Sequence, residues 1–247
     1  MLFLFCAGGG VAGYFIYERV NTAADKMVSN NNLRQITIAA QNYESTYRGL
    51  PTNSYSPTGQ PLLSWRVHIL PYIEQGSLYT QFNLNEPWDG PTNKRLLASM
   101  PKVYATPEER KGKVAMSTKT FYRGFSSQGT LFSRGDNIGP GGMRFGMGDI
   151  NDIGPVPKGR SLVSIVDGTS NTIFCLEAGE AIEWTKPEDL DISVGRPMPK
   201  LGGIRPSDNT VNVAFCDGSV RMIKKTNSES TWRAMATYSG GEVVPYE

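Results

Sequence analysis

Residues 211–223 read VNVAFCDGSVRMI. Apolar and polar residues alternate on both sides of Asp217 and Gly218, and an Asp-Gly pair between two alternating runs is the strongest short-range sign of a β-hairpin. We therefore predict two antiparallel strands joined by a tight turn at these two residues.

A second strand, turn and strand pattern precedes this hairpin in the chain. The apolar run of residues 162–166 is followed by a turn at Asp167 and Gly168, and then by a second apolar run over residues 172–177. Two such patterns close together predict an antiparallel sheet in the C-terminal half of the chain.

An amphipathic helix is predicted upstream, over residues 21–48. Its apolar residues recur at spacings of three and four, which places them on one stripe of a helix. The residues of this stripe are Leu33, Ile36, Ala40, Tyr43 and Tyr47. Because the stripe needs a surface to cover, we predict an α+β domain over residues 49–247, with the helix packed on the antiparallel sheet. Three consecutive asparagines at residues 30–32 are the expected place for a kink.

The first 17 residues, MLFLFCAGGGVAGYFIY, contain no charged side chain. As a helix they would be about 25 Å long, against a hydrocarbon core of about 30 Å. We predict a transmembrane anchor over residues 1–20 that continues into the amphipathic helix. A cleaved signal peptide is the alternative, because small residues follow at 22–24. Gly9 and Gly13 have the G-x-x-x-G spacing that lets a second helix approach closely.

The composition favours a globular protein rich in turns. Of the 247 residues, 39% are hydrophobic and 19% are charged, which is enough apolar material for a sizeable core. The formal net charge of +2 is too small to attract the phosphate backbone of nucleic acid, so we expect no nucleic-acid partner. Cys175 and Cys216 each end a strand-like run, and two readings stay open: a disulfide or two buried thiols.

Catalytic residues are scarce. His68 is the only histidine, its neighbours are apolar, and no serine or cysteine nucleophile motif accompanies it. We therefore expect His68 to be structural and the protein to have no enzymatic activity or cofactor. The one metal hypothesis is a calcium site at Asp149, Asn151 and Asp152, whose oxygen side chains sit in a loop; solvated carboxylates are the alternative.

Several short stretches resemble, in order, a large planctomycete family of proteins with a domain of unknown function. They are NNLRQI (31–36), LSWRV (63–67), LPYIEQ (70–75), PWD (87–89), MPKV (100–103), DGTSNTI (167–173), WTKPEDL (184–190) and DGSV (217–220). Many members carry a prepilin-like N-terminus and a C-terminal His-x9-Asp-Gly motif. The resemblance implies a pilin-like or pseudopilin-like architecture, with the domain exported and the N-terminal helix anchored or assembled.

The sequence departs from this family pattern at two places. Ser207 occupies the position of the family's histidine, ten residues before Asp217, so any role of that histidine is not carried over. Pilin-like chains also have a glutamate as fifth residue of the mature chain, whereas the first acidic residue here is Glu18.

These features lead to two functional hypotheses. The first is a membrane-anchored, pilin-like structural or assembly protein of the cell envelope. Its domain lies outside the cytoplasm, in the periplasm or at the cell surface, and it self-associates through the N-terminal helix. The second is an anchored binding module for a glycan or small solute, which would use an exposed Trp184 and the glycine-rich loops.

Overall fold

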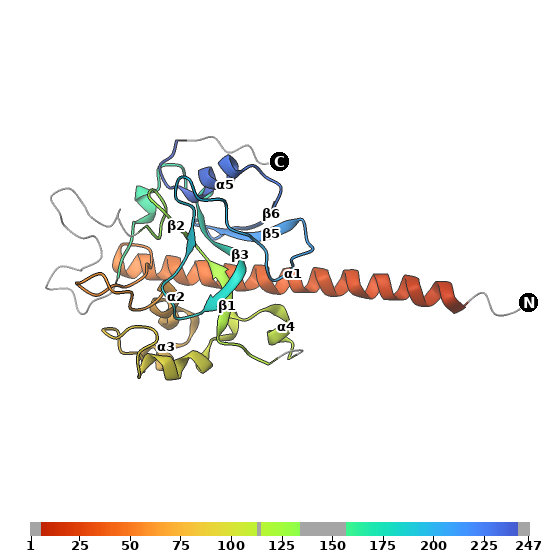
Figure 1. The fold of residues 1–247 in the computed structure, drawn as a ribbon, viewed down its shortest axis with the longest axis horizontal. Helices are drawn as coiled ribbons and strands as arrows, with labels where there is room; N and C mark the ends of the chain where they lie inside the picture. The colour runs from red at the N-terminus through yellow and green to blue at the C-terminus, as the bar shows by residue number, and fades with distance from the viewer. Residues whose placement is uncertain (1–5, 113–114, 134–156, 242–247) are drawn as a thin grey trace, which may run out of the picture.

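The structure is a computed structural model, and it describes residues 6–112, 115–133 and 157–241. Its longest element is the helix α1, Cys6–Tyr47, a single helix of 42 residues. Side chains of α1 are described from Thr22 onward. Its C-terminal half passes through the middle of the domain, and its N-terminal half extends beyond every other element (Figure 1).

The expected kink at residues 30–32 is wrong, because α1 continues through the three asparagines without interruption. Asn32 is fully buried, and its amide group donates to the Ala105 carbonyl oxygen at 3.1 Å. Its polar side chain is therefore satisfied by the rest of the domain, so it does not compete with the helix backbone.

The strands form a four-stranded antiparallel sheet in the order β1-β3-β5-β6. They span Lys119–Arg123 (β1), Ile173–Glu183 (β3), Thr210–Phe215 (β5) and Val220–Lys224 (β6). Two short strands, Phe125–Ser126 (β2) and Leu190–Asp191 (β4), pair in parallel beside the sheet. The α+β prediction, with a long N-terminal helix and an antiparallel sheet, is confirmed.

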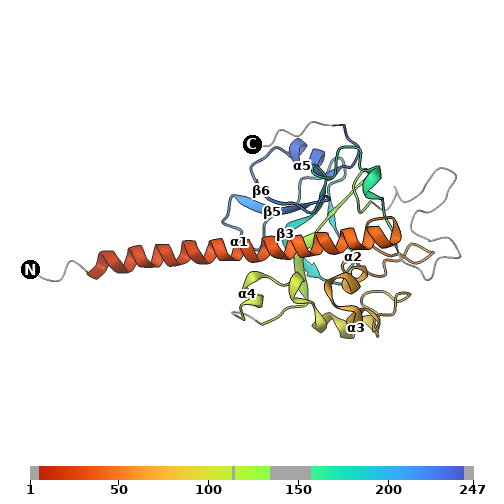
Figure 2. The ribbon, with the colours of Figure 1, turned by 180° about the vertical axis from the view of Figure 1, so that it is seen from behind.

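Short helices complete the domain. They span Trp65–His68 (α2), Leu70–Ile73 (η1), Gly76–Tyr79 (α3), Asn93–Ser99 (η2), Lys102–Tyr104 (η3), Pro107–Arg110 (α4), Leu162–Ser164 (η4) and Glu229–Ala236 (α5). Figures 1 and 2 both show β5, β6 and α5 on one side of α1 and the helices α2, α3 and α4 on the other. The C-terminal half of α1 is therefore enclosed between two layers.

Strand β5 shows how the sheet receives a helix on each face. Val213 and Phe215 pack in the apolar cluster that contains α5, whereas Ala214 and Cys216 pack in the cluster that contains α1. This alternation follows from the two-residue period of a strand. The small side chains on the α1 face let the helix lie close to the sheet.

The hairpin between β5 and β6 has its turn at Asp217 and Gly218, where Gly218 adopts a φ of 87°. The prediction of a strand over residues 162–166 is wrong, because that stretch contains the 3-10 helix η4. Asp167 and Gly168 form a turn between η4 and β3, and the Asp167 carboxylate accepts hydrogen bonds from the backbone of the C-terminal segment. Periodicity could not separate a short apolar run in a strand from one in a single helical turn.

Among the residues that the structure describes, no helix combines the length and the apolar character needed to cross a bilayer. The first five residues of the predicted anchor, 1–5, lie outside that part of the chain.

The buried carboxylate of Asp189 joins the short helix α2 to the end of strand β1 and to the loop before α2. One of its oxygens accepts from the Trp65 indole at 3.3 Å, the Arg66 guanidinium at 3.3 Å and the Gly124 backbone at 2.9 Å. The other accepts from the Asn53 amide at 2.8 Å. Burial lowers the pKa of Arg66 from its ordinary value, and the Asp189 carboxylate opposes that shift. A fully buried cation is therefore held charged by one carboxylate.

We expect Asp189→Asn to lower the free energy of unfolding by about 3–5 kcal/mol, because it leaves the buried Arg66 without a counter-charge. Asp191→Asn is the matched control. Asp191 is exposed and pairs with the exposed Arg196, so the loss of its charge should cost about 1 kcal/mol or less. Urea denaturation measures both, and equal losses would contradict this role of Asp189.

His68 is buried in α2, where its Nε2 lies 3.2 Å from the Ser54 hydroxyl. Burial lowers its pKa from 6.5 to about 3. The unfolded chain therefore takes up a proton near pH 6.5, whereas the folded domain does not do so until about pH 3. Because the unfolded state binds more protons in this range, stability is highest above pH 6.5 and falls as the pH is lowered.

The free energy of unfolding should fall by about 2 kcal/mol between pH 7 and pH 5, at a limiting slope of about 1.4 kcal/mol per pH unit. Since His68 is the only histidine, His68→Gln should largely remove this dependence. Chemical denaturation at several pH values tests this. The same slope in both proteins would show that His68 is not the group responsible.

Candidate functional site

A buried polar contact between the sheet and its surroundings is built on Glu177, in the middle of β3. This carboxylate is fully buried, and both of its oxygens accept from the Arg205 guanidinium, at 2.9 and 2.8 Å. Asn212 on β5 donates to it from its side-chain amide at 3.1 Å. Glu177 thus joins the loop that carries Arg205 to the central strands β3 and β5.

Helix α1 enters the same network through its inward face. The Ser29 hydroxyl donates to the Glu177 carboxylate and lies 3.0 Å from the Tyr122 hydroxyl. The Asn32 amide also donates to Tyr122, at 3.1 Å. Burial raises the pKa of Tyr122, so this phenol stays protonated and remains a hydrogen-bond partner.

The network also holds the backbone and the rim of α1. The side-chain amide of Asn212 donates to the Lys26 carbonyl oxygen at 3.2 Å, and the Lys26 ammonium pairs with Asp208 at 3.2 Å. Asp208 in turn accepts from Arg205 at 3.1 Å. Because these bonds are directional, they fix both the rotation and the axial position of α1 on the sheet.

The predicted stripe of α1 faces inward beside this network. Leu33, Ile36 and Ala40 are fully buried, Tyr43 is buried against them, and Tyr47 packs on Tyr43 with ring centroids 4.6 Å apart. Gly9 and Gly13 lie in the helical part of α1 that extends beyond the domain.

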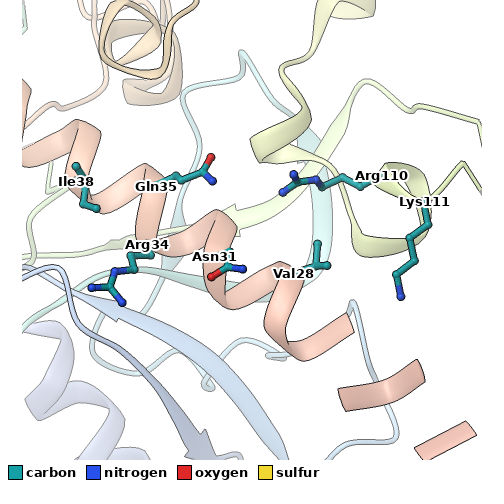
Figure 3. Close-up of a pocket in the computed structure, with 7 residues that line it drawn as sticks. All are labelled: Val28, Asn31, Arg34, Gln35, Ile38, Arg110 and Lys111. Atoms are coloured by element: carbon teal, nitrogen blue, oxygen red, sulfur yellow. The ribbon is translucent and has the colours of Figure 1, made fainter. Parts of the chain in front are cut away.

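A recess lies on the outer side of α1, where this helix meets α4 (Figure 3). Its volume is about 410 Å³, and it is lined by Val28, Asn31, Arg34, Gln35, Ile38, Arg110 and Lys111. The side chains of Gln35 and Arg110 extend toward one another across it. Three lining residues are cationic and none is acidic.

Two expected sites have different outcomes. Asp149, Asn151 and Asp152, the predicted calcium ligands, lie outside the described residues. Trp184 was expected at the surface, and this is wrong: its ring is fully buried and its indole donates to the Leu97 carbonyl oxygen at 3.0 Å. It belongs to the core that the short helices share with α1.

Cys175 and Cys216 are buried free thiols. Burial raises the pKa of both well above the ordinary range, so neither is a thiolate near neutral pH. In the part of the chain that the structure describes, no group of three or more His, Cys, Asp or Glu side chains is arranged to hold a metal ion.

Sequence reasoning missed the Glu177 network and the recess. A signal for the first was present, since Glu177 interrupts a strand of apolar residues, IFCLEA. A charge on a buried strand requires a buried partner, although its identity as Arg205 is set by the tertiary fold. The recess had no signal, because its residues come from two helices more than 70 positions apart.

The fold and these sites define an α+β domain carried on one long N-terminal helix. Residues 21–199 match the model of a family described as a protein of unknown function, DUF1559. Since the match covers more than half of the chain, the protein belongs to this family. No curated protein matches the chain, and no solved structure matches it.

Replacing Glu177 by glutamine should lower the free energy of unfolding by about 3 kcal/mol, because Arg205 would lose the fully buried one of its two carboxylate partners and keep only Asp208. Amide hydrogen exchange around Ser29 and Asn32 should become faster, since α1 loses a fixed contact with the sheet. Glu180→Gln, at an exposed position of the same strand, is the control and should change neither quantity measurably. Unchanged exchange in α1 of the Glu177 variant would contradict the proposed link.

Proposed function

We propose that this protein is a membrane-anchored, pilin-like structural or assembly protein of the cell envelope, without enzymatic activity. Its N-terminal segment is the anchor, and the α+β domain lies outside the cytoplasm, in the periplasm or at the cell surface. The observation that carries the proposal is the continuity of α1. One helix joins an uncharged N-terminal segment to a half that is embedded in the domain.

Three features support this proposal. The first 17 residues contain no charged side chain, which suits a bilayer interior. The N-terminal half of α1 extends clear of the domain, so it is free to insert or to pack against other helices (Figure 2). The C-terminal half is fixed in rotation by Glu177 and its partners, so the exposed helix has a defined orientation relative to the domain.

Self-association through the helix is part of the proposal. Gly9 and Gly13 are four residues apart and so lie on the same side of α1, where the lack of side chains permits close helix contact. Identical copies would then align in parallel, each presenting its domain at the same distance from the membrane.

The alternative, an anchored binding module for a glycan or small solute, shares the same anchor. The aromatic surface once expected for it is absent at Trp184, which is buried. The feature that keeps this alternative open is the cationic recess between α1 and α4.

The first test compares the full-length protein with a version that begins at Asp25, by vesicle flotation and electron microscopy. We expect only the full-length protein to float with vesicles and to form filaments or ordered arrays. Flotation without assembly would remove the pilin-like role and leave an anchored binding module. If neither protein floats, the anchor itself is wrong.

A pair of substitutions separates anchoring from assembly. Gly13→Leu keeps the segment apolar but blocks close helix contact, so flotation should persist while assembly falls. Gly8→Leu is the control, because it adds the same side chain about 140° around the helix. If both variants assemble equally well, the Gly9 and Gly13 face is not the contact.

A further inference from the structure

The recess between α1 and α4 has an unusual balance of charge. Arg34 on α1, Arg110 on α4 and Lys111 just after α4 all line this volume of about 410 Å³. The Arg110 side chain extends toward Gln35, whereas the Arg34 side chain points away from both of them (Figure 3). The amide side chains of Asn31 and Gln35 add further hydrogen-bond donors, and Val28 and Ile38 supply apolar wall. Within the described ranges of the chain, no carboxylate lines this recess.

Only one of the three cations pairs with a described carboxylate. Lys111 forms an ion pair with Asp25 at the rim. Among the described residues, neither Arg34 nor Arg110 has a carboxylate within ion-pair distance. The Arg110 guanidinium, which extends into the recess, therefore remains available for an external anion.

The Arg110 side chain is also held in position by the buried Asn32. Its guanidinium donates to the side-chain oxygen of Asn32, which is fully buried and whose amide nitrogen bonds to Tyr122 and to the Ala105 carbonyl oxygen. A neutral amide oxygen fixes the direction of the arginine without cancelling its charge. The remaining guanidinium donors of Arg110 are then available beside Gln35 (Figure 3).

We propose that this recess binds an oxyanion group, a carboxylate or a phosphate, of a solute outside the membrane. Planar guanidinium groups match the two oxygens of a carboxylate or phosphate, and charge-assisted hydrogen bonds of this kind are stronger than neutral ones. The amides of Asn31 and Gln35 would complete the donor set around the bound oxygens. This inference does not depend on assembly of α1, since every lining residue belongs to the domain.

Lipid headgroups of the anchoring membrane do not fit as the source of the anion. Under the proposed anchor, the membrane segment ends at Val20, and Arg34 follows 14 residues later, about 21 Å further along the helix. The polar layer of a bilayer is only about 5–8 Å thick on each side. The anion must therefore come from the surrounding solution or from another molecule in it.

The test is calorimetric titration of the full-length protein with citrate and, separately, with inorganic phosphate at low ionic strength. Sodium chloride of matched ionic strength is the blank. We expect saturable binding of at least one of the two, at millimolar or lower concentration. Binding of citrate alone assigns the recess to carboxylates, and binding of phosphate alone assigns it to phosphates.

Substitutions locate the binding. Arg110→Gln should weaken it by about fivefold to tenfold, because one charge-assisted contact is lost. Arg110 is an exposed residue, so this variant should fold normally. Arg95→Gln removes the same charge from an exposed site on η2 and should leave the affinity unchanged. The proposal is overturned if neither anion binds saturably, or if both variants bind as the unaltered protein does.

Discussion

The domain depends on the burial of one helix between two layers. The inward face of α1 is apolar where it meets the short helices and the small residues of β5, and it is polar where it meets Glu177. Apolar contact supplies most of the stabilisation but little directional preference. The hydrogen bonds of Ser29 and Asn32 supply the direction, so the two kinds of contact together select one arrangement of helix and sheet.

On the other side of α1, too, apolar contacts are given direction by a buried polar group. There the short helices have little internal cooperativity, because each spans one or two turns, and so their shape must come from tertiary contacts. For α2, the Asp189 carboxylate provides such contacts by accepting hydrogen bonds from three separate segments around a buried arginine. The two buried acids, Glu177 and Asp189, thus each fix one layer around the core.

The elements with strong periodicity could be predicted from the sequence. The stripe from Leu33 to Tyr43 and the Asp217-Gly218 hairpin each carry a pattern repeated several times, and the helix and the hairpin lie where the patterns place them. The apolar run at residues 162–166 was too short for its period to decide between strand and helical turn. Trp184 was misplaced because neighbouring charges suggested a surface loop, whereas its ring enters a core formed by residues far away in the chain. The Glu177 partners and the recess were beyond prediction for the same reason: each joins segments separated by many residues, and no local pattern encodes which segments meet.

The uninterrupted path of α1 has a mechanical consequence. A pull on the N-terminal end along the helix axis passes directly into the centre of the domain, with no hinge between them to absorb it. There the hydrogen bonds made by Ser29, Asn32 and the Lys26 carbonyl oxygen lie within two turns of the helix, so a load on α1 reaches all three together. Under the proposed anchor, the domain would therefore resist a pull along the helix axis as one unit.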